Sequence, residues 1–312
     1  MKIFARCIGV LFILMSVNFT ALSQNAEFEG YKEINGVNLF FKVVGAGEPI
    51  LIVHGGPAMN HDYFLPHLTP LTKNYKLIFY DQRSSGRSYI PEDSSKSISH
   101  RIMVEDIEAI RKEFGIKKLN LFAHSWGAKL AVNYALQYPE KAGMLILSNP
   151  VTFSHDYDSA QRAVMAQKTS ETDERRRKSI MESDAFRYGN LDSYEDLLRI
   201  TYKTSFFDTM NVGKLDIILP DNFFQQNAHL MKGLYTDFKY YDINYYPELK
   251  ALRAPVLILH GRADNIPLEA DERLRSSMRN AELVVFDSSG HFPFIEENEK
   301  FTSAILAFMG KK

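Results

Sequence analysis

The chain has 312 residues, of which 45% are apolar and 24% are charged. This composition is typical of a globular protein with a sizeable buried core, and the length suits one large α/β domain with an insertion, or two ordinary domains. The formal net charge of −1 argues against a nucleic-acid partner and against binding to an anionic membrane surface.

The first 23 residues have the pattern of a secretory signal peptide. Lys2 and Arg6 precede an apolar run over residues 8–17, and residues 21–23 read Ala-Leu-Ser, which suits a cleavage point. The alternative is an uncleaved anchor, but a membrane-spanning helix needs about 20 apolar residues and this run is shorter. We therefore expect a cleaved signal and a secreted or periplasmic protein, with no stable membrane insertion after cleavage.

The only cysteine of the sequence, Cys7, lies inside this predicted signal. The mature chain would then contain no disulfide and no thiolate metal site, so its stability has to come from the hydrophobic core. We expect neither a metal nor a cofactor.

After the signal, residues 30–45 predict a β-hairpin, because Asn35-Gly36 separates two alternating segments. Two short apolar runs follow within 49–57 and 75–88, and each ends in a loop rich in Gly or Ser. Such runs are typical of strands buried on both faces of a parallel sheet. Residues 99–115 then carry apolar side chains at helical spacing, which predicts an amphipathic helix.

The same alternation continues towards the carboxyl terminus. Residues 117–136 predict a strand, a turn and a helix, and a final helix is expected from Glu296 to Met309. Further buried strands are predicted within 142–150, 254–264 and 281–291. Alternating strands and helices of this kind predict an α/β fold with a mostly parallel, doubly wound sheet.

The segment over residues 151–250 differs from the rest, because it is charged, helical in pattern and rich in Tyr and Phe, without a buried parallel strand. Its basic run at 173–178 is expected on a solvated helix face rather than as a binding patch. Its aromatic residues over 223–246 form its own core or line a ligand pocket. The predicted organisation is a signal peptide over 1–23, a core formed by 24–150 and 251–312, and a helical cap over 151–250.

Ser125, Asp264 and His291 occur in the order that nucleophilic hydrolysis on such a sheet requires. Ser125 lies at a strand-to-helix turn in Ala-His-Ser-Trp-Gly, a version of Gly-x-Ser-x-Gly in which Ala123 replaces the first glycine. Asp264 and His291 each follow a buried strand, and active sites of open sheets lie at such carboxyl ends. The alternative for Ser125 is an ordinary helix N-cap, which would require nothing from the rest of the chain.

The sequence also offers two main-chain donors for an oxyanion. Residues 51–57 read Leu-Ile-Val-His-Gly-Gly-Pro, a turn that can direct the amide of Gly56, or that of Gly55, at a developing negative charge. The amide of Trp126, directly after the candidate nucleophile, is the second predicted donor.

These motifs resemble those of the proline iminopeptidase branch of the α/β-hydrolases. The matching blocks are His-Gly-Gly-Pro-Ala at 54–58, Asp-Gln-Arg-Ser-Ser-Gly-Arg-Ser at 81–88, Ala-His-Ser-Trp-Gly-Ala at 123–128, Gly-Arg-Ala-Asp-Asn-Ile-Pro at 261–267 and Ser-Ser-Gly-His-Phe at 288–292. The resemblance implies an α/β-hydrolase fold with a helical cap insertion. It also implies a triad of Ser125, Asp264 and His291, with oxyanion donors from Gly56 and Trp126.

The resemblance bears on other charged residues as well. In the family, the loop that contains Asp81, Arg83 and Arg87 mainly supports the structure beneath the active site, and we expect this rather than a catalytic role. Asp81 is disfavoured as the triad acid because Asp264 occupies the expected loop. Asp287 is expected to be a turn residue.

The cap departs from the family pattern. Iminopeptidases hold the free amine of the substrate with acidic residues of the cap, often set among tryptophans, whereas the only Trp here is Trp126. Asp196 and Asp237 lie near the matching places and are the candidates for binding the amine. The alternative is that both are surface carboxylates.

The prediction is a serine hydrolase without metal or cofactor that acts on a small molecule or short peptide. The leading candidate is an aminopeptidase that releases an N-terminal residue such as proline. The alternatives are an esterase or amidase for small carboxylic esters or amides, and a non-catalytic, ligand-binding member of the fold. Relatives with an aspartate nucleophile, such as dehalogenases and epoxide hydrolases, are disfavoured because Ser125 occupies that position. The oligomeric state is not predicted.

Overall fold

A computed structural model of the chain describes residues 26–91, 98–235, 237 and 244–311, so the predicted signal peptide over 1–23 lies outside the described residues. Eight strands form one sheet in the order β1-β2-β4-β3-β5-β6-β7-β8. They are β1 (Ala26–Ile34), β2 (Val37–Val44), β3 (Glu48–Val53), β4 (Tyr75–Tyr80), β5 (Leu119–His124), β6 (Ala142–Ser148), β7 (Val256–Gly261) and β8 (Ala281–Phe286).

The sheet combines an antiparallel edge with a parallel centre. β1 and β2 form the predicted hairpin, and both residues of its turn, Asn35 and Gly36, have positive φ (48° and 76°), as a tight hairpin turn requires. β2 pairs antiparallel with β4, whereas every neighbouring pair from β4 to β8 is parallel. Every residue of β5 and of β7 is buried, which confirms the mostly parallel, doubly wound α/β sheet.

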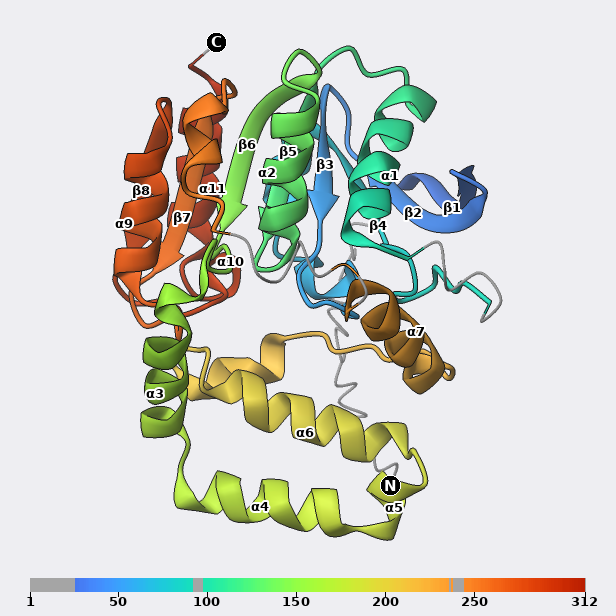
Figure 1. Cartoon of the computed structure of the whole chain (residues 1–312), viewed down its shortest axis with the longest axis vertical. Helices are drawn as coiled ribbons and strands as arrows, with labels where there is room; N and C mark the ends of the chain where they lie inside the picture. The colour runs from blue at the N-terminus through green and yellow to red at the C-terminus, as the bar shows by residue number, and fades with distance from the viewer. Residues whose placement is uncertain (1–25, 92–97, 236, 238–243, 312) are drawn as a thin grey trace, which may run out of the picture.

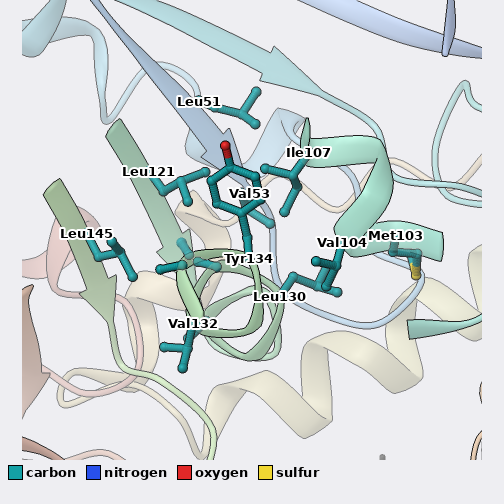
Figure 2. Packing of buried hydrophobic residues seen from close by; sticks show 14 of the residues in the cluster. Leu51, Val53, Met103, Val104, Ile107, Leu121, Leu130, Val132, Tyr134 and Leu145 are labelled. Atoms are coloured by element: carbon teal, nitrogen blue, oxygen red, sulfur yellow. The ribbon is translucent and has the colours of Figure 1, made fainter. Parts of the chain in front are cut away.

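Helices cover both faces of the sheet. Side chains of α1 (His100–Glu113), α2 (Gly127–Gln137) and α9 (Leu268–Ser277) share one apolar cluster with one face, and α11 (Asn298–Met309) shares a second cluster with the other. Figure 2 shows the first cluster, where Leu51 and Leu121 of the strands pack against Ile107 of α1 and Tyr134 of α2. Alternate strand residues therefore enter opposite cores, and neither face of the sheet centre is left to solvent.

The chain between β6 and β7 forms helices that lie beyond the carboxyl ends of the parallel strands (Figure 1). These cap helices are α3 (Asp158–Lys168), α4 (Glu171–Glu182), α5 (Asp184–Arg187), α6 (Leu191–Lys203) and α7 (Phe223–Tyr235). In the described part of this segment no strand occurs, in keeping with the sequence pattern. The loops that follow the parallel strands, which carry the candidate residues, therefore lie between the sheet and the cap helices.

The predicted final helix is interrupted. Instead of one helix from Glu296 to Met309, the chain forms a short helix α10 (Pro293–Glu296) and then α11. Glu297, between them, has non-helical angles (φ −126°, ψ 51°). Its carboxylate accepts hydrogen bonds from the Ser288 amide (2.9 Å) and the Ser289 hydroxyl (2.7 Å). The break between α10 and α11 thus allows the Glu297 carboxylate to hold residues 288 and 289, which directly precede Gly290 and His291.

Over the described ranges, no helix combines the length and the apolar character that crossing a bilayer requires.

Candidate active site

Ser125 lies in the turn from β5 to α2 (residues 124–127, hereafter the elbow). Its φ of 53° is rare for a residue with a side chain, and such strain is typical of functional turns. The turn is held by hydrogen bonds from the Ser125 amide to the Ser148 oxygen (3.0 Å) and from the Ala128 amide to the Ser125 oxygen (3.0 Å). The fully buried Ala123 is accommodated before it, so this altered motif still forms the sharp turn.

Gly127 is required by close packing of the elbow on β3. A Cβ atom at this position would lie 2.6 Å from the main-chain oxygen of His54 and 2.7 Å from that of Val53. No real Cβ atom tolerates such distances to backbone, so only glycine lets α2 begin here. The second glycine of the motif therefore has a steric role that the first position, Ala123, does not share.

Asp264 and His291 meet across two neighbouring loops, after β7 and β8 respectively. Nδ1 of His291 lies 2.8 Å from Oδ2 of Asp264, and the carboxylate is almost completely buried. Burial alone would raise the pKa of Asp264, but the adjacent His291 and the Asn149 amide lower it to about 2. The carboxylate can only accept at neutral pH, so Nδ1 carries a proton and Nε2 of a neutral His291 is left as a base.

The elbow that carries Ser125 contacts the histidine of this pair through His124, whose Nε2 lies 3.0 Å from the main-chain oxygen of His291. His124, the residue before Ser125, has its ring centre 4.7 Å from that of His291. Within the described residues, no hydrogen bond joins the Ser125 hydroxyl to His291. Catalytic hydrogen bonds are often long or poorly aligned before a substrate is bound, so the missing bond does not exclude proton transfer from Ser125 to His291 during a reaction.

Asn149 is a site residue that the sequence analysis did not identify. It follows β6, and its side-chain amide donates to Oδ2 of Asp264 (2.7 Å) and to the main-chain oxygen of Gly290 (3.2 Å). Asn149 has a positive φ of 45°, which asparagine tolerates better than most residues. Its position at the carboxyl end of a parallel strand is the signal that could have identified it.

The glycine-rich loop after β3 (residues 54–57, hereafter the oxyanion loop) packs against the elbow. A Cβ atom on Gly55 would lie 3.0 Å from the Cβ atom of Ser125. The Gly55 amide donates to the Tyr63 hydroxyl at 2.7 Å, so it is already used. The amides of Gly56 and Trp126 make no hydrogen bond within the described part of the chain. Of the two glycines that the sequence left open, Gly56 therefore has the available donor.

His54 fixes this loop to the strand beside it. It is fully buried, its Nδ1 lies 2.8 Å from the Gly55 oxygen, and its Nε2 accepts from the Gln82 amide at 3.0 Å. Burial lowers the pKa of His54 to about 4, so the imidazole is neutral. These contacts indicate that His54 supports the oxyanion loop.

Asp81 and its neighbours also contact protein rather than the space above Ser125. Asp81 accepts from Nδ1 of His61 at 2.6 Å and from the Arg87 amide at 2.9 Å. The Arg83 guanidinium forms a buried double hydrogen bond with Asp106 of α1. Arg83 also donates to the main-chain oxygen of Asn35 in the hairpin turn (3.3 Å), so these contacts join the loop to the hairpin and to α1, as expected of a supporting loop.

Asp287 is exposed in the turn after β8, where it pairs with Arg262 at 2.7 Å. This position fits the predicted turn residue.

The segment directly after α6 (residues 204–208) packs on the loop that carries His291 (residues 287–292, hereafter the histidine loop). The His291 amide donates to the Ser205 oxygen at 2.6 Å, and the Phe206 ring stacks on Phe292 with centres 4.8 Å apart. Glu296 accepts from the Gly290 amide (2.7 Å) and from the Asp208 amide (3.0 Å). This end of the cap helices and the histidine loop are therefore held as one unit.

The two candidate amine-binding carboxylates have different surroundings. Asp196 on α6 forms an ion pair with Arg176 of α4 (2.9 Å), and both side chains are about half exposed. Asp237 follows α7, and its amide donates to the Leu234 oxygen at 3.0 Å. Its charge adds to the burial that raises the pKa of Tyr245. No hydrogen bond connects either carboxylate to the candidate triad within the described residues, and their role stays a prediction.

Among the described residues, no group of three or more His, Cys, Asp or Glu side chains is arranged to hold a metal ion.

The comparisons with known proteins agree with the geometry. A family model described as "alpha/beta hydrolase fold" matches residues 48–298. The chain is 27% identical over 311 residues to a proline iminopeptidase of Saccharolobus solfataricus, and the match covers 94% of this chain and 95% of that protein. This similarity confirms the predicted resemblance to proline iminopeptidases.

Solved structures show the same fold. A proline iminopeptidase-related protein of Thermus thermophilus superposes with a TM-score of 0.67 at 21% identity, covering 91% of this chain and 98% of that one. An esterase of Exiguobacterium antarcticum superposes with a TM-score of 0.64 at 19% identity, covering 91% and 100%. At these identities the similarities establish the fold alone.

Proposed function

Because the chain belongs to the α/β-hydrolase fold family, we propose that it is a serine hydrolase that works through Ser125, His291 and Asp264. The observation that supports this proposal most strongly is the buried hydrogen bond between Asp264 and His291 beside the elbow that carries Ser125. That bond fixes one tautomer of the imidazole and leaves Nε2 as the base.

In the proposed reaction, Nε2 of His291 takes the hydroxyl proton while Oγ of Ser125 attacks the substrate carbonyl carbon. The amides of Gly56 and Trp126 donate to the oxyanion that forms. The protonated His291 then gives its proton to the leaving amine or alcohol, and an acyl-enzyme on Ser125 remains. Water, deprotonated by His291, attacks this ester and releases the acid together with free Ser125.

We propose that the substrate is a short peptide from which an N-terminal residue such as proline is released. The support is the similarity along nearly the whole chain to proteins named proline iminopeptidase, at 27% and 26% identity in two archaeal cases. An exopeptidase of this type has to bind a protonated amine, and Asp196 and Asp237 are the candidate partners. The cap helices would restrict the site to small substrates.

A second candidate is an esterase or amidase for small carboxylic esters or amides, and one specific observation favours it. Tyr202 of α6 and Phe206, which follows that helix, pack aromatic rings rather than a carboxylate against Phe292 of the histidine loop. Asp196, the nearest predicted acid on that helix, is already paired with Arg176. Apolar surroundings of this kind beside the candidate base would suit an uncharged substrate.

The proposal is tested with a fluorophosphonate probe and two substrates. The wild type should be labelled and Ser125→Ala should not. Labelling that persists in Ser125→Ala would reject the assignment of the nucleophile, and an unlabelled wild type would support a non-catalytic protein. Turnover of proline anilide and of a short-chain aryl acetate, measured side by side, separates the aminopeptidase from the esterase.

We also propose that residues 1–23 are a cleaved signal peptide and that the mature protein is secreted or periplasmic. The support is the basic start, the apolar run and the small residues at the predicted cleavage point. Expression of the full chain, followed by fractionation and N-terminal sequencing, should give an exported protein that begins at Gln24. A membrane-bound protein with an intact N-terminus would support the anchor instead.

A further inference from the structure

One buried chain of hydrogen bonds joins three loops at the candidate site. The Gly55 amide donates to the Tyr63 hydroxyl at 2.7 Å, and that hydroxyl lies 2.8 Å from Nδ1 of His124. On the other side of the same imidazole, Nε2 lies 3.0 Å from the main-chain oxygen of His291. The chain thus runs from the oxyanion loop through the elbow to the histidine loop.

The direction of each hydrogen bond follows from the groups at its ends. The main-chain oxygen of His291 can only accept, so Nε2 of His124 carries the proton. Nδ1 of His124 is then an acceptor, and the Tyr63 hydroxyl donates to it. That hydroxyl uses its oxygen to accept from the Gly55 amide. Every donor in the chain has one acceptor, so the chain requires a neutral His124 in a single tautomer.

The surroundings keep His124 in this state. Tyr63 and His124 are 1% and 2% exposed, and the His124 ring packs against both Phe292 (centres 5.4 Å apart) and Phe294 (5.3 Å). Burial, together with the neighbouring His291, holds the pKa of His124 well below its usual value. The titratable groups around it are Tyr63, His54, His291 and Asp264, and Asp264 is engaged by His291 and Asn149.

We propose that Tyr63 and His124 are positioning residues, which set the distance between the oxyanion loop and the histidine loop that hydrolysis at Ser125 needs. The proposal rests on the proposed function. Neither side chain has to touch the substrate. Tyr63 holds the Gly55 amide, which leaves the next amide, that of Gly56, as the donor to the oxyanion. His124 holds the main chain of His291, from which the imidazole that acts on Ser125 projects.

This arrangement predicts an effect on the rate rather than on substrate affinity. A displacement of about 1 Å between reacting groups is enough to reduce turnover about 100-fold. Loss of the Tyr63 hydroxyl or of the His124 imidazole frees one loop to shift relative to Ser125. The substrate-binding surface of the cap helices is unaffected, so kcat should fall while KM changes little.

Three variants test the two ends of the hydrogen-bond chain, and a fourth variant controls for the general effect of losing a buried hydrogen bond. Tyr63→Phe removes the hydroxyl that holds the oxyanion loop. His124→Asn keeps an acceptor near Nδ1 and loses the donor to His291, whereas His124→Gln can place an amide N–H near the position of Nε2. Tyr134→Phe is the matched control, because Tyr134 is equally buried and its hydroxyl donates to Glu108 at 3.1 Å, in the core of α1 and α2.

The measurements are kcat and KM on an aryl acetate, with active protein counted by fluorophosphonate labelling and folding checked by thermal unfolding. We expect kcat to fall about 10- to 100-fold in Tyr63→Phe and in His124→Asn, with KM within about twofold of the wild type. His124→Gln should recover part of the loss, and Tyr134→Phe should keep the wild-type kcat. Variants Tyr63→Phe and His124→Asn that match Tyr134→Phe in kcat would overturn the proposal.

A second readout does not depend on turnover. In ¹⁵N-labelled protein, His124 should show a protonated Nε2 and an unprotonated Nδ1 from about pH 5 to pH 9, the range in which an ordinary histidine titrates. If the probe does not label the wild type, the proposed function fails. The ¹⁵N spectrum would still show whether the hydrogen-bond chain through His124 exists. An Nδ1–H tautomer, or titration of His124 within that range, would overturn it.

Discussion

The side-chain amide of Asn149 donates a hydrogen bond to the same oxygen of Asp264 that faces His291. The same amide also reaches the oxygen of Gly290, the residue before His291. One buried side chain at the end of β6 therefore fixes both the candidate acid and the loop of the candidate base. Loss of the Asn149 side chain should therefore disturb the orientation of Asp264 and His291, although both residues remain present.

Asn149→Gly tests this role without backbone strain, because glycine accepts the positive φ of the position. We expect kcat to fall about tenfold with little change in KM. Loss of a hydrogen bond to a charged group should cost about 1.5–3 kcal/mol of unfolding free energy. Steady-state kinetics and urea unfolding measure the two effects, and an unchanged kcat would show that Asp264 is oriented without Asn149.

The roles of two buried carboxylates are separated by a pair of isosteric substitutions. Asp264→Asn should reduce turnover by about 10⁴-fold, as in other Ser-His-Asp triads, because the amide removes the negative charge beside the imidazole and replaces one acceptor oxygen with a donor. Asp81→Asn should mainly destabilise the fold, by about 3–5 kcal/mol, because it removes the charge that His61 and Arg87 contact. Kinetics and thermal unfolding of both variants provide the test. The reverse pattern would mean that Asp81 is the acid.

His54 makes stability depend on pH. Its pKa is about 4 in the folded protein and 6.5 is the reference value, so the unfolded chain binds the proton more tightly. Its contribution to stability is therefore complete above pH 6.5 and is lost as the pH falls towards 4. Integrated over this range, the shift amounts to about 3 kcal/mol.

His54→Asn keeps a donor towards Gly55 but cannot titrate, so unfolding free energies of the variant should fall less steeply below pH 6.5 than those of the wild type. The other buried histidines are present in both proteins and cancel in the difference. Parallel pH dependences would show that His54 is not the source of the acid sensitivity.

Much of the sheet could be predicted because each central strand is a short apolar run bounded by Gly, Ser or Pro. Ser125, Asp264 and His291 could be proposed as site residues for the same reason, since each follows such a run. Tyr63 could not be found, because its role arises only where its hydroxyl meets His124, 61 residues away in the sequence. Glu297 shows the same limit: its helix is broken by contacts with Ser288 and Ser289, which no helical periodicity records.

Ala123→Gly restores the glycine that related motifs have at this position. Ala123 is fully buried in β5 between Val53 and Leu147 of the neighbouring strands. The alanine methyl group does not prevent the elbow, so activity should stay within about threefold of the wild type. Stability should fall by about 0.5–1 kcal/mol, because glycine loses more conformational freedom in a strand. A large rise in kcat would indicate that the methyl group strains Ser125.

The substrate class depends on how the protein treats a protonated amine. A buried ammonium requires a carboxylate partner, and loss of that partner leaves the charge unpaired. Asp196 is half exposed and paired with Arg176, and such exposed pairs contribute only about 0–1 kcal/mol. Asp237 has no hydrogen bond to a cationic side chain among the described residues, so it is the better candidate for the amine.

Under the aminopeptidase proposal, Asp237→Asn should reduce kcat/KM for proline anilide by an amount equivalent to about 2–5 kcal/mol. The same substitution should leave kcat/KM for an aryl acetate of similar size almost unchanged, because that substrate has no charge to bind. Asp196→Asn is the matched control and should have a small effect on both substrates. Equal, small effects of both substitutions on both substrates would remove the amine-binding role and favour the esterase, because the protein would then treat a charged and an uncharged substrate alike.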